Sequence, residues 1–178
     1  MDAAANYRDR YIALLEEHTP ALRRLCHSYC EASPEAEDLF QEIAVALWTA
    51  LARFRGDSSE RTWLYRVAHN VALTFTARRR RRVQREQPVS DEMDVMDTGN
   101  DQESRVADAQ NAATLRRLVQ ELPFEDRRLI LLYLEGLPTA EIEEVTGLTR
   151  SNVTVRLSRL RQKLSDRMQN LKARRVKS

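Results

Sequence analysis

The chain has 178 residues, enough for one domain or two small ones, and a net charge of only +2, which excludes a uniformly basic protein. Four Gly, five Pro and few β-branched runs favour an all-helical fold. No apolar run approaches the ~20 residues that a membrane-spanning helix needs. Because Asp2, Arg8 and Asp9 interrupt any signal-peptide pattern, we expect a cytoplasmic protein.

Charge is distributed unevenly along the chain. Residues 78–82 are an unbroken run of arginine, and the segment after Arg150 is rich in Arg and Lys, with Asp166 as its single acid. Residues 90–103, by contrast, are acidic. Segregation of this kind predicts two cationic surfaces for a polyanion, joined by an acidic connector.

The N-terminal part is predicted to begin with two short helices, residues 7–18 and 20–31. A third helix should run from Ser33 to about residue 53, because Ser33 can act as a cap and Pro34 suits a first helical turn. Its apolar positions indicate a core face, and Asp38, Gln41 and Glu42 lie on the other side. That acidic stripe is either plain solvated surface or a docking face for a basic protein.

Two cysteines fall in the second of these helices. Cys26 and Cys30 are four residues apart with His27 between them, so a zinc or redox site is conceivable. On a helix, however, Cys26 continues the apolar stripe formed by Leu22 and Leu25. We therefore expect small buried thiols rather than a metal site.

After a break at residues 54–59, another helix should run from about residue 60 into the arginine run. One face of this helix is apolar, whereas Arg66, His69 and Asn70 lie opposite, with Trp63 on a flank. Aromatic rings interleaved with cations suit a single-stranded nucleic acid, because bases stack on rings and cations hold the backbone. Alternatively, Trp63 and Tyr65 are core residues and His69 is ordinary surface.

Residues 87–106 contain Pro, Gly and many acids with little to bury, which predicts a flexible linker. The two flanking parts, residues 1–86 and 107–178, are predicted to be separate small helical domains. In the second, helices are expected at about 107–122 and 125–135. A helix-turn-helix should follow at residues 139–164, with its tight turn at Gly147.

The last helix of this motif is amphipathic and basic. Thr149 is a plausible cap, and Val153, Leu157 and Leu160 begin a stripe that should pack on Ile142, Val145 and the helix that carries Leu134. The opposite face has no acid before Asp166. Small polar side chains there would let the helix approach base edges in the DNA major groove, while arginines such as Arg156 contact phosphates. A merely solvated basic helix is the alternative.

Four segments together resemble the extracytoplasmic-function (ECF) sigma factors of bacterial RNA polymerase, which belong to the sigma-70 family. The segments are residues 36–43 (AEDLFQEI), 54–70 (FRGDSSERTWLYRVAHN), 122–132 (LPFEDRRLILL) and the helix-turn-helix. Their order and spacing fit nearly the whole chain. The resemblance implies a region 2 domain to about residue 86 and a region 4 domain from about residue 107. Such a protein binds core RNA polymerase, directs promoter recognition and −10 melting, and is commonly controlled by an anti-sigma factor.

The resemblance also implies roles for individual positions. Asp38, Gln41 and Glu42 would belong to the polymerase-binding surface. Residues on or near the elements that open and read the −10 element as single strand would be Trp63, Arg66, His69 and Asn70, with Arg78 and Arg79 adding cations. Residues facing the −35 duplex would be Arg150, Ser151, Thr154, Val155, Ser158 and Arg159. Neither a cofactor nor a metal is implied.

Some positions depart from the family pattern, and they bear on promoter sequence rather than on class. Thr74 stands where an acid is common, Pro138 where a capping Ser or Thr is common, and Thr154 and Val155 replace the usual Lys and Ser.

Three other classes of protein are the alternatives. A dimeric helix-turn-helix repressor or response-regulator output domain would bind a palindrome unaided. The second class is an enzyme, but the sequence contains no recognisable phosphate loop, metal cluster or nucleophile elbow. The third is a pure protein-docking module, which would leave the two cationic surfaces unexplained.

Overall fold

A computed structural model describes residues 3–30, 32–85 and 103–176. These described residues form seven helices and no strand, which confirms the predicted all-α class. The N-terminal unit contains α1 (Ala3–Tyr29), α2 (Ser33–Leu51) and α3 (Glu60–Arg85). The C-terminal unit contains α4 (Glu103–Gln120), α5 (Phe124–Leu134), α6 (Thr139–Thr146) and α7 (Arg150–Val176). Within the described parts of the chain, no helix is both long and apolar enough to cross a membrane.

Helices α1, α2 and α3 pack around a core of aliphatic side chains. Leu22 of α1, the predicted core face of α2 and Leu64 of α3 are completely buried. The face of α2 follows helical spacing through Leu39, Ile43 and Leu47, all buried, so burial of this stripe holds the helix in place.

The first helix is longer than predicted, since the structure has one continuous α1 with Pro20 inside it instead of two short helices. Proline removes one backbone hydrogen bond, but Pro20 and Glu16, whose carbonyl loses its partner, both lie on the exposed side. Leu14 before the proline and Leu22 after it are buried in the same core. Core packing before and after Pro20 therefore keeps the helix continuous, although a proline would end an isolated helix.

The start of α2 also differs from the prediction. Ala32 is the cap residue, in extended conformation, and no side chain caps the helix; Ser33 is already its first residue. Pro34 does lie in the first turn, where its missing N–H costs nothing. Proline at this position thus sets the beginning of the helix without the serine side chain.

In the C-terminal unit, α7 packs on α4, α5 and α6 through the predicted apolar stripe. Val153, Leu157 and Leu160 are buried, as are Ile142 and Val145 beneath them. Leu134 was expected in this core, but it lies at the last residue of α5 and is half exposed. Helix α4 begins at Glu103, so the last four residues of the predicted linker are helical; residues 87–102 lie outside the described residues.

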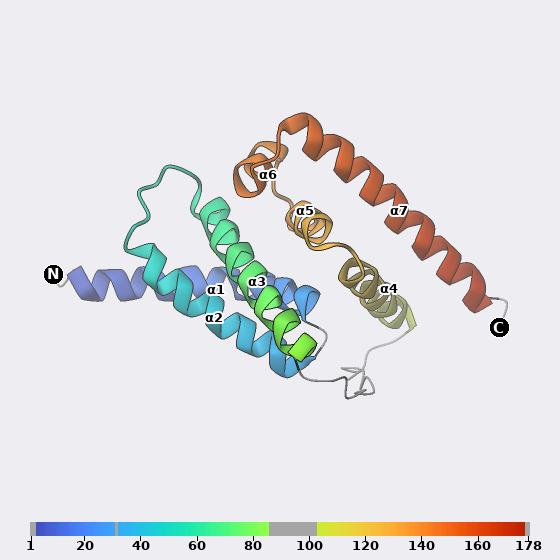
Figure 1. Ribbon diagram of the computed structural model, residues 1–178, viewed down its shortest axis with the longest axis horizontal. Helices are drawn as coiled ribbons and strands as arrows, with labels where there is room; N and C mark the ends of the chain where they lie inside the picture. Colours follow the sequence, from blue (N-terminus) through green and yellow to red (C-terminus); the bar gives the residue numbers. More distant parts are fainter. Residues whose placement is uncertain (1–2, 31, 86–102, 177–178) are drawn as a thin grey trace.

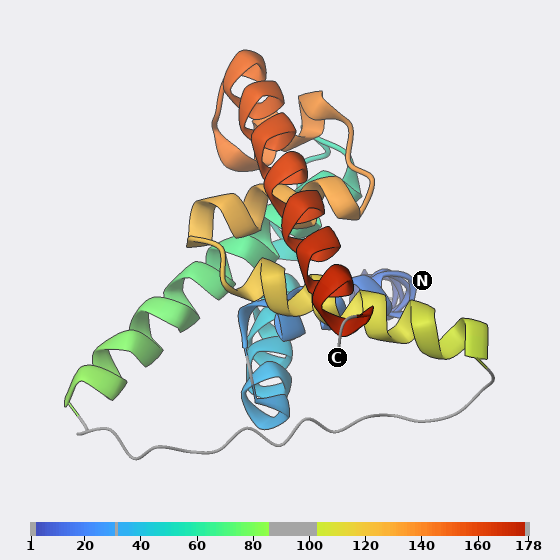
Figure 2. The same cartoon turned by 90° about the vertical axis from the view of Figure 1, so that its right-hand side faces the viewer.

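The two units are packed against each other (Figures 1 and 2). Helix α3 contacts α6 and α5, and α1 contacts α4. As a result, α3 is covered on two sides, by α1 and α2 of its own unit and by the C-terminal unit. Thr62, Tyr65 and His69 on the second side are buried.

The turn of the helix-turn-helix depends on the backbone of Gly147, which has φ +73° in the left-handed region. A Cβ added there would meet nothing within 4 Å, so the cost of a side chain is purely conformational. We predict that Gly147→Ala lowers the free energy of unfolding by about 1 kcal/mol, because an L-residue in this region is strained. Urea denaturation measures the change. Gly147→Asn should lose less, since Asn tolerates this conformation, and an alanine variant as stable as the parent would contradict the assignment.

Candidate nucleic-acid and polymerase interfaces

The outer face of α7 is open. Gly147 ends α6 in the left-handed conformation, and the Thr149 hydroxyl accepts a long hydrogen bond (3.5 Å) from the amide of Asn152, so Thr149 caps α7 as predicted. The first two turns of α7 pack on the core through Val153 and Leu157, and their other side faces away from it. All six residues predicted to face the −35 duplex are exposed: Arg150, Ser151, Thr154, Val155, Ser158 and Arg159.

The charge of this outer face is almost wholly positive. Arg150, Arg159 and Lys163 are exposed on it. Two other cations of α7 are engaged within the unit. Arg156 forms an ion pair with Asp126 at 2.5 Å, and the Arg161 guanidinium lies over the Tyr133 ring, 5.2 Å from its centre. Arg156 was expected to contact phosphates, but here it ties α7 to α5.

The residues predicted for the −10 site fall into two groups. Asn70 is exposed and Arg66 half-buried, whereas Trp63 and His69 are buried. Trp63 packs against the Phe54 ring at 5.0 Å between centres, within its own unit. The alternative that Trp63 is a core residue is therefore confirmed, while the view of His69 as surface is wrong, because the C-terminal unit covers it.

Arg78 and Arg79 lie at the far end of α3 and form ion pairs with α2. Arg78 contacts Glu42 at 2.5 Å, and Arg79 contacts Glu35 at 2.9 Å. Because these pairs are partly exposed and solvent screens them, each contributes little to stability. The arginines stay accessible for exchange with a polyanion.

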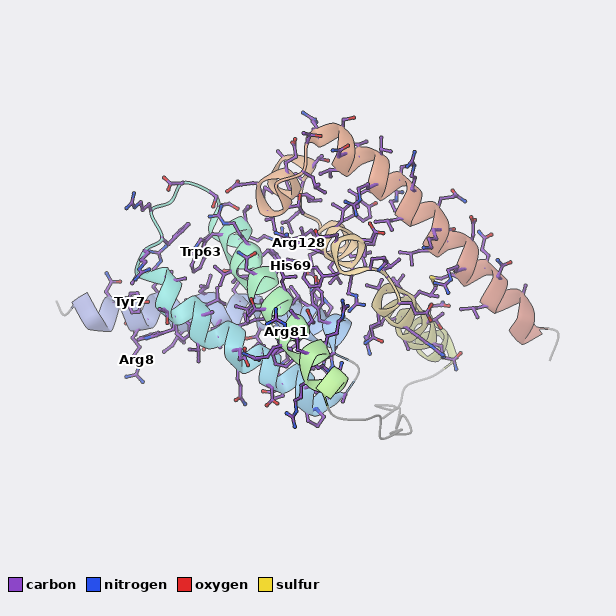
Figure 3. All side chains as sticks on the ribbon, in the orientation of Figure 1. Tyr7, Arg8, Trp63, His69, Arg81 and Arg128 are labelled. Carbon is purple, nitrogen blue, oxygen red and sulfur yellow. The ribbon has the colours of Figure 1, made fainter. Side chains whose placement is uncertain are left out.

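His69 lies where the two units meet, beside Arg128 of α5 (Figure 3). Its Nδ1 hydrogen-bonds the Tyr29 hydroxyl at 2.9 Å, while Nε2 is buried with no hydrogen-bond partner. Burial, with the Arg128 charge adding to it, lowers the pKa of His69 to about 3. The ring is therefore neutral at physiological pH.

Acidic side chains of the C-terminal unit meet polar residues of the N-terminal unit along α3. The Glu135 carboxylate accepts two hydrogen bonds from Arg24, at 2.9 and 2.7 Å. The Thr62 hydroxyl donates to Glu141 at 2.5 Å, and Arg66 lies 3.6 Å from Glu144. Sequence reasoning missed these contacts, because each joins residues far apart in the chain and no local sequence pattern predicts which residues pair.

Helix α2 presents the predicted polymerase-binding residues on its outer side. Asp38 and Gln41 are exposed, and Glu42 is half-buried through its pair with Arg78. Next to them, Val45 and Trp48 are 66% and 42% exposed, so the acidic stripe continues into an apolar one. The rings of two α1 tyrosines pack edge-on against Trp48, a cluster that the sequence analysis did not single out.

Both cysteines are buried and free, as predicted. Burial raises the pKa of Cys26 to about 12 and that of Cys30 to about 11. The thiols are therefore protonated and poorly nucleophilic at neutral pH. No group of three or more His, Cys, Asp or Glu side chains that could hold a metal ion occurs among the described residues.

The fold and the exposed recognition helix define a DNA-binding protein of two helical units. Family comparison gives the class: residues 14–82 match the Sigma-70 region 2 model, and residues 112–164 match Sigma-70, region 4. The RNA polymerase sigma-H factor of Pseudomonas aeruginosa is 32% identical over 146 residues, 77% of this chain and 75% of that protein. The ECF RNA polymerase sigma-E factor of Escherichia coli K12 is 30% identical over 151 residues, 78% of this chain and 76% of that protein.

Two solved structures share the fold. The sigma factor RpoE of Bartonella quintana, in complex with the anti-sigma factor NepR, aligns with a TM-score of 0.67 and 22% identity, covering 90% of this chain and 95% of that chain. CnrH, in complex with the cytosolic domain of CnrY, aligns with a TM-score of 0.63 and 24% identity, covering 92% and 90%. The chain belongs to the sigma-70 family and is an ECF sigma factor of RNA polymerase.

The buried neutral His69 predicts a pH dependence of stability. An unfolded histidine binds a proton below about pH 6.5, whereas the folded ring, with its pKa lowered to about 3, does not. Stability is thus unaffected above pH 6.5 and falls as the pH drops below it. This residue should cost about 2 kcal/mol between neutral pH and about pH 5. Urea titrations of the parent and of His69→Gln at a series of pH values measure the effect. If the free energy of unfolding falls equally with pH in the two proteins, the prediction is contradicted.

Proposed function

We propose that this sigma factor grips a promoter at two places while core RNA polymerase holds its two units apart. In this proposal α7 reads the −35 element as duplex, α3 and the loop before it open and read the −10 element, and α2 docks on the polymerase. The protein itself carries out no catalytic step; it supplies specificity in the cytoplasm, where the polymerase works. The observation that carries the proposal is the exposed outer face of α7, which has no acid before Asp166.

The −35 assignment is supported by the shape and charge of that face. Ser151, Thr154 and Ser158 are short and exposed, so the α7 backbone can come close to base edges. The exposed Val155 offers an apolar contact suited to a thymine methyl group. Arg150 and Arg159 extend to either side, at the places where phosphates flank a helix in the major groove.

The −10 assignment is supported by the exposed polar and cationic side chains of α3. Asn70 is exposed in the middle of the helix, one turn beyond Arg66. Cations continue through Arg78 and Arg79 along the same helix and could hold the backbone of a separated strand. Trp63, by contrast, contributes as a buried support under the 54–59 loop, because its ring packs on Phe54.

For α2, the support for polymerase as the partner is the kind of side chains that the helix exposes. The exposed Asp38 and the half-buried Glu42 lie beside exposed Val45 and Trp48, and such a mixture of charge and apolar area is typical of a protein interface. An anti-sigma factor is a further partner in this proposal. Its support is the shared fold with RpoE and CnrH, whose solved structures contain the anti-sigma factor NepR and the cytosolic domain of CnrY respectively.

Each unit alone needs to bind only weakly. Once the polymerase fixes both units on one DNA molecule, binding of the first raises the effective concentration of the second. Tight binding then requires both elements at the correct separation. A dimeric repressor would instead bind a palindrome without polymerase, so specific initiation by the purified chain plus core polymerase on a promoter library separates the two classes.

Replacing the α7 arginines should weaken −35 recognition. We predict that Arg150→Ala or Arg159→Ala lowers holoenzyme affinity for the selected promoter about tenfold and reduces the slope of log affinity against log salt by about one each. Filter binding across a salt series measures both. Arg8→Ala is the matched control, because it removes the same charge from the exposed start of α1. An equal loss in the control would show that only net charge matters.

Replacing Asn70 should impair strand opening without disturbing the fold, because its side chain is exposed. We predict that Asn70→Ala lowers open-complex formation, followed by permanganate reactivity of unpaired thymines, while a −35 duplex fragment is still bound by the holoenzyme. Trp63→Ala is less informative, since removing a buried ring costs about 3–5 kcal/mol of stability by itself. Unchanged opening in Asn70→Ala would exclude this residue from the −10 site.

A further inference from the structure

The loop that joins α2 to α3 is fixed at both of its ends. At its first end, the Phe54 ring packs against the Trp63 ring, with 5.0 Å between their centres. At its second end, the Ser59 hydroxyl accepts a hydrogen bond from the Thr62 amide at 3.1 Å and so caps the start of α3. Residues 55–57, between these ends, are exposed. The 54–59 loop therefore presents a short, open turn between two anchored ends.

One side chain of α1, that of Arg10, contacts both ends of this loop. Its Nη2 and Nε atoms donate hydrogen bonds to one carboxylate oxygen of Glu60, at 2.8 and 3.2 Å. The same guanidinium lies over the Phe54 ring, 5.5 Å from its centre. Glu60 is the first residue of α3, whereas Phe54 follows α2. Arg10 thus bridges the beginning and the end of the loop, and Figure 1 shows the loop on the same side of the molecule as the first turns of α1.

The backbone that carries Arg10 is itself anchored. The Tyr11 hydroxyl donates a hydrogen bond to the Ala44 carbonyl at 2.8 Å. The Tyr7 hydroxyl donates to the Trp48 carbonyl in the last turn of α2. Both tyrosine rings also pack edge-on against the Trp48 ring, with 4.8 and 4.9 Å between centres. These contacts hold the first turns of α1 on the second half of α2, so Arg10 acts on the loop from a fixed position.

The contact between Arg10 and Glu60 adds little to global stability. Their side chains are 48% and 41% exposed, and solvent screens an ion pair of this kind. A loop that is already ordered, however, loses less conformational freedom when a ligand binds to it. The effect of this ion pair is therefore expected in what the loop binds, and not in the unfolding of the chain.

From these contacts we infer that Arg10 is a positioning residue for −10 recognition: through Phe54 and Glu60 it holds the 54–59 loop in the conformation that receives the separated strand. The inference rests on the proposed function of α3 and this loop. Arg10 precedes residue 14, where the Sigma-70 region 2 match begins, so the match does not include it. Without this contact the loop has to be ordered when the strand binds, which weakens strand binding and leaves the duplex contact of α7 unchanged.

A matched control for Arg10 lies on the same helix. Arg23 pairs with Glu37 at 2.6 Å, the two side chains are 47% and 44% exposed, and the Arg23 guanidinium lies 4.6 Å from the centre of the Phe40 ring. This pair joins α1 to the first half of α2 and does not contact the 54–59 loop. Arg23→Ala thus removes the same charge and the same kinds of contact as Arg10→Ala at a place away from the loop.

Hydrogen exchange of the purified chain tests whether Arg10 orders the loop. The amides of Phe54 and Thr62 are hydrogen-bonded at its two ends, to the Leu51 carbonyl and the Ser59 hydroxyl. In Arg10→Ala these amides should exchange at least about threefold faster than in the parent, and in Arg23→Ala at the parent rate. Both variants should melt within about 2 °C of the parent. Equal exchange in the parent and Arg10→Ala overturns the inference.

Binding by the holoenzyme tests the consequence for strand recognition. The probe is a promoter fragment selected by the parent holoenzyme, with its −10 strands kept apart by mismatches. Arg10→Ala should bind this fragment about tenfold more weakly than Arg23→Ala, whereas both should bind a fully paired −35 fragment equally. Equal binding of the mismatched fragment, or an equal loss on the −35 fragment, overturns the inference.

Replacing the acid of the pair separates positioning from charge. Glu60→Gln removes a negative charge, so an effect of charge alone would strengthen DNA binding. If the loop is positioned through Glu60, this variant should instead bind the mismatched fragment severalfold more weakly than the parent, and adding Arg10→Ala should cause little further loss. Glu37→Gln is the matched control and should bind at least as tightly as the parent. Glu60→Gln binding as tightly as Glu37→Gln overturns the inference.

The fate of the proposed function is read separately. If the parent holoenzyme fails to initiate at any promoter of the library, the proposed function is wrong. If it initiates normally while Arg10→Ala matches Arg23→Ala in hydrogen exchange and in binding of the mismatched fragment, only the positioning role of Arg10 is wrong.

Discussion

Helix α3 packs on two sides at once, and this double packing determines how the two units are arranged. Its apolar side completes the core of the N-terminal unit through Leu64 and Ala68. On its polar side, Tyr65 and Thr62 contact the carboxylates of Glu135, which follows α5, and of Glu141 in α6. The polar side of α3 is therefore satisfied by acids of the chain itself, which tie the C-terminal unit to the N-terminal unit.

The α7 face is different, because nothing in the described residues competes for it. Its buried stripe fixes the helix on α4, α5 and α6, and the left-handed Gly147 sets the direction in which the helix leaves the turn. The exposed side can then be short and basic without loss of stability. The outer face of α7 is therefore exposed while the polar side of α3 is covered.

Much of this could be predicted from local pattern, because helical spacing and turn residues act over a few positions. The stripe of α7, the turn at Gly147 and the outer face of α2 follow from such spacing. Pro20 misled the prediction, since only tertiary packing shows that its exposed side tolerates a missing hydrogen bond. His69 misled it as well: helical spacing correctly placed it opposite the core stripe, but the cover comes from a unit beyond residue 102.

Hydroxyl-radical footprinting of Tyr65 tests the central claim most directly, that one side of α3 is covered in the free chain and uncovered on the polymerase. Tyr65 is 1% exposed and hydrogen-bonded to Glu135, while Trp63 is buried within its own unit and serves as an internal reference. The account predicts that Tyr65 is protected in the free protein and becomes reactive in the holoenzyme without DNA, with Trp63 protected in both. Strong oxidation of Tyr65 in the free chain, or no change on binding the polymerase, would contradict it.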